Sequence, residues 1–82
     1  MRLTRHARNP LRWIGRQHPN VTAEALIEAL PAAETIGYDD RGNGRVRLAV
    51  GGTRLTVVMD ESAGVVITLW VDWSHGGLHL RH

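Results

Sequence analysis

The stretch RVRLAVGGTRLTVVMDESAGVVITLWV, residues 45–71, decides the fold of this chain. Apolar and polar residues alternate along most of it, which is typical of β-strands with one buried face. The pair Gly51 and Gly52 predicts a two-residue hairpin turn, and residues 60–64 predict a second turn. Three consecutive strands joined by such short turns indicate an antiparallel β-meander.

A weaker strand precedes this meander. The segment TIGY, residues 35–38, has β-forming residues and leads into DDRGNGR, residues 39–45. The Gly and Asn residues of that second segment favour a turn, because they adopt the backbone angles that turns require. The sequence therefore predicts a fourth strand beside the other three.

The beginning of the chain predicts a short helix. Asn9 is a favourable N-cap and Pro10 suits the first helical position, so we expect a helix over about residues 10–18 that ends before Pro19. A longer helix from Thr4 is the alternative, but it would hold Pro10 inside at a cost of about 3 kcal/mol.

A second helix is predicted over residues 23–30, with Thr22 as its N-cap and Pro31 at its exit. Glu24 lies in its first turn, where a negative charge suits the positive end of the helix dipole. The stripe that this helix would bury consists of Leu26, Ile27 and Leu30.

The order of these elements predicts an α+β domain, with two N-terminal helices packed on one face of a four-stranded antiparallel β-meander. Trp13 and Ile14 are expected to pack the first helix against the sheet. The domain is expected to span residues 1–74, and a flexible tail with three histidines to span residues 75–82.

The strand pairing predicts which residues share each face of the sheet. The glycine turn pairs Leu48 with Leu55, and we expect the next turn to pair Met59 with Val65. One face then forms the core; its members are Val46, Leu48, Val50, Leu55, Val57, Met59, Val65, Ile67, Leu69 and Val71.

The opposite face combines arginines, hydroxyl groups and an indole, and we expect no helix to cover it. Such a surface suits a phosphate chain with bases that can stack. The alternative is an ordinary solvated face on which Trp70 packs over arginine stems. The same pairing puts Arg47, Thr56 and Thr68 in one row, Arg54 and Trp70 in the next, and Arg45 and Asp72 towards the ends.

Positive charge is concentrated at the start of the chain. Residues 1–16 hold five arginines and no acid, whereas residues 20–40 hold five acids and no base, although the net charge is only +2. Guanidinium groups donate paired hydrogen bonds that suit phosphates and carboxylates. Arg8, Arg12 and Arg16 are spaced by four, so a helix there would group them on one side.

Several classes of protein and site are not indicated. The chain has no cysteine, which excludes disulfides and thiolate metal sites. Its longest apolar run, residues 65–71, is too short to span a bilayer, so we expect a soluble cytoplasmic domain without a membrane partner. His75 and His79 have the spacing of a helical metal pair, but the two glycines between them disfavour a helix, and we predict no metal site.

His6 stands among the N-terminal arginines. An imidazole near neutral pH can act as a general acid or base beside a bound phosphodiester. The alternative is a surface histidine without a chemical role.

The segments LTRHARNPLRWIGR (3–16), VTAEALIEALP (21–31) and RVRLAVGGTRLTVVMDESAGVVITLW (45–70) resemble the small bacterial toxin proteins of the RelE/BrnT type. These share a fold with barnase, EndoU and colicin ribonucleases, and the resemblance covers about residues 3–71. It implies RNA cleavage without a metal or other cofactor, with RNA on the open face beside the first helix. In that scheme His6 is the base or acid, Arg47 and Arg54 clamp the phosphate, and Thr68 orients the reacting group.

The first functional hypothesis is therefore a toxin-like, metal-independent endoribonuclease with His6, Arg47 and Thr68 as catalytic residues. A second is a non-catalytic module that binds nucleic acid, and a third is a protein that recognises an acidic partner, such as an antitoxin or a host protein. The basic surface that all three would use consists of Arg5, Arg8, Arg12, Arg16, Arg45, Arg54, Thr56 and Trp70.

Overall fold

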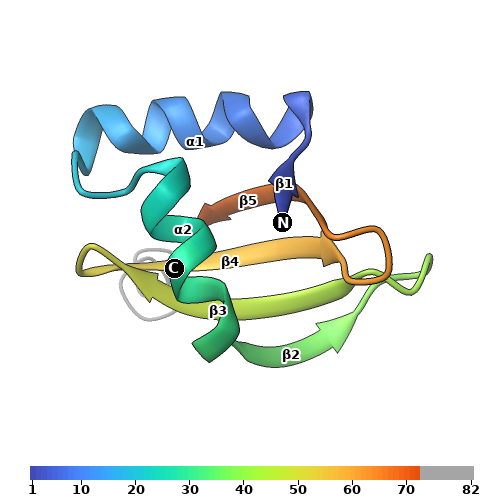
Figure 1. Ribbon diagram of the computed structural model, residues 1–82. Coiled ribbons are helices and arrows are strands. Elements are labelled where there is room, and N and C mark those ends of the chain that lie inside the picture. Colours follow the sequence, from blue (N-terminus) through green and yellow to red (C-terminus); the bar gives the residue numbers. More distant parts are fainter. Residues whose placement is uncertain (73–82) are drawn as a thin grey trace, which may run out of the picture.

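The computed structural model describes residues 1–72, so the predicted tail of residues 75–82 and the predicted domain end at residue 74 lie outside the described residues. Within these described residues, two helices and five strands follow one another (Figure 1). They are β1 (Arg2–Leu3), α1 (Arg5–Gln17), α2 (Ala23–Ala29) with a 3₁₀ turn (Leu30–Ala32), β2 (Glu34–Tyr38), β3 (Gly44–Val50), β4 (Thr53–Asp60) and β5 (Val65–Val71).

The five strands form one mixed sheet in the order β1-β5-β4-β3-β2. The α+β class is confirmed, but the prediction of four antiparallel strands is wrong in detail, because β1 adds a fifth strand parallel to β5. The backbone N–H of Arg2 donates to the carbonyl of Gly64 at 2.9 Å, and that of Thr4 donates to Val66 at 3.0 Å. A strand of two residues is too short to show a period, so sequence patterning missed it.

Helix α1 begins at Arg5, so the predicted start after Asn9 is wrong and the longer alternative from Thr4 is right. The Thr4 hydroxyl oxygen accepts a hydrogen bond from the backbone N–H of Ala7 at 3.1 Å, which is the role of an N-cap. The same hydroxyl donates to the carbonyl of Ile67 at 3.0 Å. This contact fixes the first turn of α1 against β5.

Pro10 therefore lies inside α1. It has no N–H to donate to the carbonyl of His6 one turn earlier, and its ring crowds that carbonyl. The buried side chains of Ala7 and Leu11 hold the helix on both sides of the proline. Burial of these side chains and the Thr4 cap offset the cost of a proline inside the helix. Neither contact can be read from the local sequence around Pro10.

Helix α2 is close to its prediction, except that its last turn tightens into the 3₁₀ turn. Thr22 is the N-cap, as predicted, and its hydroxyl oxygen accepts from the backbone N–H of Ala25 at 3.1 Å. Pro31 lies in the 3₁₀ turn, which starts β2 on its path along the sheet edge.

The pairing of β3 with β4 is confirmed. Leu48 faces Leu55, and Val50 faces Thr53 across the turn. Gly51 and Gly52 have φ angles of +57° and +83°, which are accessible to glycine without strain.

The pairing of β4 with β5 differs from the prediction, and Met59 faces Val66 instead of Val65. Asp60 extends β4 by one residue, because its carboxylate accepts from the Ser62 hydroxyl and thereby closes the turn. A one-residue slip alone would turn every β5 side chain to the other face. A bulge at Ile67 restores the alternation.

As a result Val66 enters the core, whereas the predicted core positions of Val65 and Ile67 are wrong. Leu69 stays on the core face, opposite Val57.

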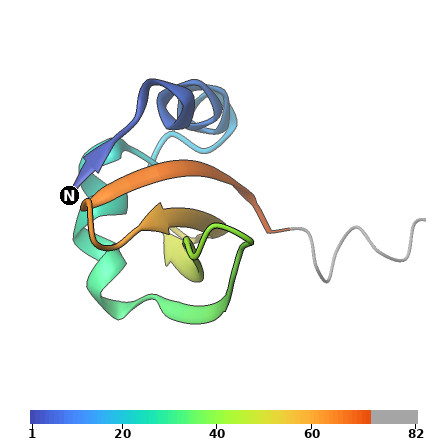
Figure 2. The same cartoon turned by 90° about the vertical axis from the view of Figure 1, so that its right-hand side faces the viewer.

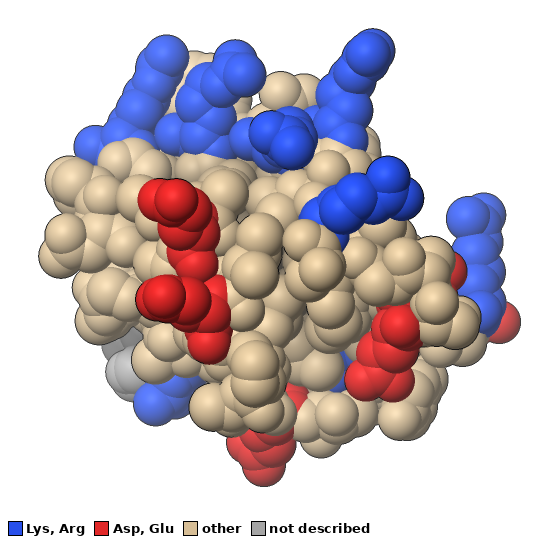
Figure 3. All heavy atoms as spheres, in the orientation of Figure 1, with Lys and Arg blue, Asp and Glu red and all other residues tan. Residues whose placement is uncertain are grey.

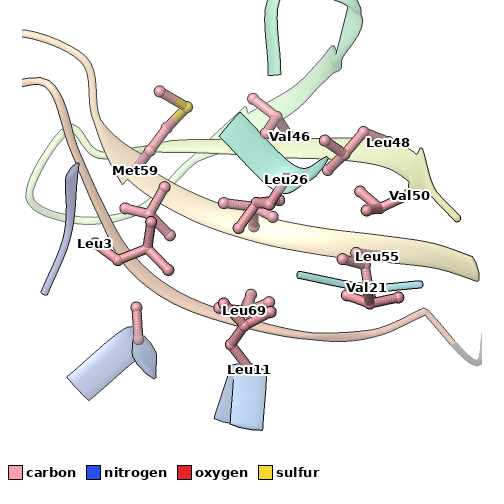
Figure 4. Packing of buried hydrophobic residues seen from close by; sticks show 13 residues of the cluster. Leu3, Leu11, Val21, Leu26, Val46, Leu48, Val50, Leu55, Met59 and Leu69 are labelled. Atoms are coloured by element: carbon pink, nitrogen blue, oxygen red, sulfur yellow. The ribbon is translucent and has the colours of Figure 1, made fainter. Parts of the chain in front are cut away.

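Both helices cover the same face of the sheet, as predicted, and within residues 1–72 the other face carries no helix (Figure 2). Figure 4 shows side chains from both helices and from β3, β4 and β5 converging on one core, with Leu26 of α2 among them. Burial of each large side chain stabilises the fold by about 1.5–3 kcal/mol. The core consists of Leu3, Ala7, Leu11, Val21, Leu26, Val46, Leu48, Val50, Leu55, Val57, Met59, Val66 and Leu69.

Candidate nucleic-acid interface

A row of exposed arginines follows the outer side of α1 and continues onto β1. All five side chains are exposed, and α1 has no acid in its first turn or elsewhere. Figure 3 shows positive charge gathered along the edge formed by α1, with acids over α2 below it. We call this surface the basic stripe; its members are Arg2, Arg5, Arg8, Arg12 and Arg16.

The basic stripe carries uncompensated charge. Within residues 1–72, no arginine of the stripe has a carboxylate within ion-pair distance. Arg8 and Arg12 border a groove of about 380 Å³ between α1 and α2, while Ala7 and Leu11 turn into the core. The guanidinium groups therefore project from a helix whose opposite side is packed in the core.

The position of Trp13 differs more from its prediction than that of any other side chain named above. It was expected to pack against the sheet, but its side chain is 64% exposed. Ala7, Leu11 and Ile14 occupy the core side of the helix, and at about 100° per residue Trp13 falls on the outer side. The Arg16 guanidinium carbon lies 4.5 Å from the centre of the indole ring. The longer helix adds Ala7 to Leu11 and Ile14, and these three form a stripe that leaves Trp13 on the outside.

The open face of the sheet differs in register from the prediction. Arg47, Thr56 and Trp70 form one row, and Arg45 and Thr68 lie in the next with Val58 between them. The predicted rows that paired Thr68 with Thr56, and Trp70 with Arg54, are wrong by two residues; one comes from the turn after Asp60 and the other from the β5 bulge. Arg45 and Arg54 are exposed on this face.

Thr56 does not contribute a free hydroxyl to this face. Its side chain is buried, with 4% of the residue exposed, and the adjacent Val58 is 8% exposed. Trp70 in the same row as Thr56 remains 43% exposed. The middle strand of the open face, β4, thus has two buried side chains on this face.

Arg47 is engaged in an ion pair. Its Nε lies 2.8 Å from Oδ2 of Asp72, whose side chain is only 6% exposed, whereas that of Arg47 is 38% exposed. The pair joins β3 to the residue after β5, across β4. One edge of the Arg47 guanidinium therefore neutralises a carboxylate of the protein and is not available to clamp a phosphate.

A groove of about 430 Å³ lies at the other end of the open face, between the β2–β3 loop and the sheet. Arg45 and Thr68 line it together with Asp39 and Asp40. Hydrogen bonds donated by the side chain and backbone of Asn43 lower the pKa of Asp39. An ionised carboxylate beside Arg45 makes this groove a poor site for a phosphate chain.

His6 is exposed on α1, which covers the face opposite to that of Arg47 and Thr68. No hydrogen bond or ion pair among the first 72 residues joins His6 to either of them. The structure thus does not bring the three predicted catalytic residues into contact, and their catalytic role stays a prediction.

Comparison with protein-family models, with curated proteins and with solved structures found no match. In the part of the chain from residue 1 to residue 72, no group of three His, Cys, Asp or Glu residues is placed to hold a metal ion. No helix in this part is long and apolar enough to cross a membrane.

Proposed function

We propose that this protein binds nucleic acid, with RNA as the expected partner, through the basic stripe of β1 and α1. The observation that carries the proposal is that five exposed arginines lie along one edge without an acid or an ion pair among residues 1–72. The conformation of the helix fixes the spacing of four of them, so little ordering is needed when they bind.

Phosphate binding is the chemistry that suits such a surface. Guanidinium groups donate paired hydrogen bonds to phosphate oxygens, and each neutralised phosphate releases condensed counterions. The local concentration of charge matters here more than the net charge of +2, because the acids lie mainly elsewhere, including on α2.

A membrane surface is a less suitable partner. Interfacial helices insert an apolar side between lipid chains. The apolar side of α1 is already used, because Ala7 and Leu11 are buried in the core. Only its polar, arginine-rich side faces outward.

Endoribonuclease activity, which the resemblance implies, remains a separate prediction. General acid–base cleavage requires that base, acid and phosphate clamp reach one phosphodiester. The ion pair of Arg47 and the position of His6 on α1 do not favour this arrangement, so the proposal is binding. Incubation with labelled RNA in EDTA, followed by a denaturing gel, tests cleavage directly.

The experiment that tests binding compares two variants with equal loss of charge. The stripe variant carries Arg5→Gln, Arg8→Gln and Arg12→Gln, and the face variant carries Arg41→Gln, Arg45→Gln and Arg54→Gln. All six side chains are exposed, so both proteins should fold. Affinity for a fluorescent 20-nucleotide RNA is measured by anisotropy between 50 and 300 mM salt.

We expect the stripe variant to bind about 100-fold more weakly than the wild type near 0.1 M salt, since three phosphate contacts each contribute a salt slope of about 0.7. Its slope should be smaller by about 2. The face variant should retain most of the affinity. Equal losses in both variants would contradict the location, and no binding by the wild type at 50 mM salt would contradict the function and favour an acidic protein partner.

A further inference from the structure

Trp13 is exposed in a place where the fold does not need it. Tryptophan is usually largely buried, because its indole is the largest apolar side chain. Here 64% of the residue is exposed, and Trp13 is not one of the 13 residues that form the core. A large exposed ring on a rigid helix has no structural role that these contacts reveal.

Arg16 holds the indole in place. The guanidinium carbon lies 4.5 Å from the ring centre, within the range of a cation–π contact. The two residues are three apart on α1, so the helix sets their relative position. This contact orders the ring before any ligand arrives and lowers the entropy lost on binding.

The surroundings of Trp13 are polar and positive. Arg12 directly precedes it in the sequence and Arg16 follows three residues later. Asn9, one turn before it, and Gln17, one turn after it, are also exposed. The buried core of a protein interface is more apolar than the rest of the surface, and the exposed neighbours of this ring are polar or charged. A flat ring beside a row of phosphate-binding cations is instead the arrangement used for unpaired bases.

We propose that Trp13, oriented by Arg16, is a stacking site for an unpaired base, and that the protein therefore prefers single-stranded nucleic acid to a duplex. This inference rests on the proposed binding of nucleic acid by the basic stripe. In a duplex the base faces are covered by their neighbours, so only a single strand can place a base on the indole while its phosphates contact Arg12 and Arg5.

The test uses three proteins and three probes. The proteins are the wild type, Trp13→Ala and Tyr38→Ala; Tyr38 is also 64% exposed but lies on β2, at the far edge of the sheet from β5. The probes are a single-stranded 20-nucleotide RNA, an RNA duplex of the same length, and an RNA strand of the same length in which every nucleotide is abasic. Circular dichroism of each protein verifies its fold before affinities are measured.

We expect Trp13→Ala to bind the intact single strand about 5- to 150-fold more weakly than the wild type, the range for one base–aromatic stack. Its affinity for the duplex and for the abasic strand should be unchanged within about twofold. Tyr38→Ala should match the wild type on every probe, and Trp13→Phe should recover most of the lost affinity.

The two proposals fail in different ways. If the wild type binds intact and abasic strands equally, or if Trp13→Ala weakens all three probes equally, stacking is overturned while binding by the basic stripe stands. If the wild type binds none of the probes, both proposals are overturned, and an acidic protein becomes the partner to seek.

Discussion

Nε of Arg47 and Oδ2 of Asp72 lie 2.8 Å apart and connect β3 to the end of β5 across the open face. The carboxylate is nearly buried, so Arg47 is placed to stabilise the sheet. The resemblance to RelE/BrnT proteins instead implies that this arginine clamps a phosphate. The side chain of Arg47 has a structural partner before it meets any ligand.

Replacing Arg47 by Leu should therefore lower the free energy of unfolding by about 1–3 kcal/mol, because a carboxylate with 6% exposure loses a charged partner. Arg54→Leu is the matched control, since Arg54 is exposed on the same face; it should change stability by less than about 0.5 kcal/mol. Urea denaturation of both variants measures the difference. Equal stabilities would show that the ion pair contributes nothing.

The loop between β2 and β3 should make stability depend on acid pH through Asp39. Hydrogen bonds from the side chain and backbone of Asn43, and from the backbone of Arg41, lower the pKa of this carboxyl below 3.8. A lowered pKa in the folded state means that the stabilisation is complete above the unfolded value near 3.8 and is lost as the pH falls through the folded value.

Asp39→Asn should thus lower stability at pH 7 and flatten the decline of stability as the pH falls below about 4. Asp40→Asn is the control, because the hydrogen bonds of the loop go to Asp39. Thermal unfolding over this pH range distinguishes the two. The same acid dependence in wild type and Asp39→Asn would show that this loop does not set it.

The glycine turn offers a comparison of two adjacent positions. A Cβ on Gly51 would lie 2.8 Å from the backbone oxygen of Asn20, whereas a Cβ on Gly52 would have nothing within 4 Å. Both have positive φ, which costs other residues about 1–2 kcal/mol.

Gly52→Ala should then destabilise by about 1–2 kcal/mol, and Gly51→Ala by about 2–5 kcal/mol, since overpacking against the backbone adds to the strain. Chemical denaturation measures both. If the two variants lost the same stability, the close approach of the α1–α2 connection to the turn would be without consequence.

Pro10 provides a prediction in the opposite direction. Pro10→Ala restores a backbone donor for the carbonyl of His6 inside α1, and we expect it to stabilise the protein by about 2 kcal/mol, the helix penalty reduced by the added freedom of the unfolded chain. Pro31→Ala should instead lose up to about 1 kcal/mol, because Pro31 lies near the start of a 3₁₀ turn that suits its fixed φ. The melting temperatures should move in opposite directions; a lower melting temperature for Pro10→Ala would show that its ring packs usefully.

The sheet was predictable where neighbouring residues alone set the geometry. The alternation in β3 and β4 and the two glycines between them determine the pairing of Leu48 with Leu55. Thr22 and Pro31 mark the limits of α2 and its 3₁₀ turn in the same local way. The clustering of positive charge before residue 17 is also a property of the sequence itself.

The candidate interface was predicted only in part. The arginines of α1 were identified from their spacing, but Trp13 was wrongly assigned to the core. The buried stripe is complete only when the longer helix adds Ala7 to Leu11 and Ile14. Arg47 and Thr56 were assigned to an accessible face on correct β3–β4 pairing. An ion pair and burial, which the pairing does not reveal, make them less accessible.

The sequence by itself determined the meander, the two helices and the separation of charge, because these follow from contacts between residues close in the chain. The tertiary structure alone decided the start of α1, the parallel strand β1 and the bulge at Ile67. Each depends on a contact between the first residues and β5, such as the Thr4 hydroxyl to the Ile67 carbonyl, 63 positions apart. Contacts at that separation override local preferences for turns and caps, and they leave no period in the sequence.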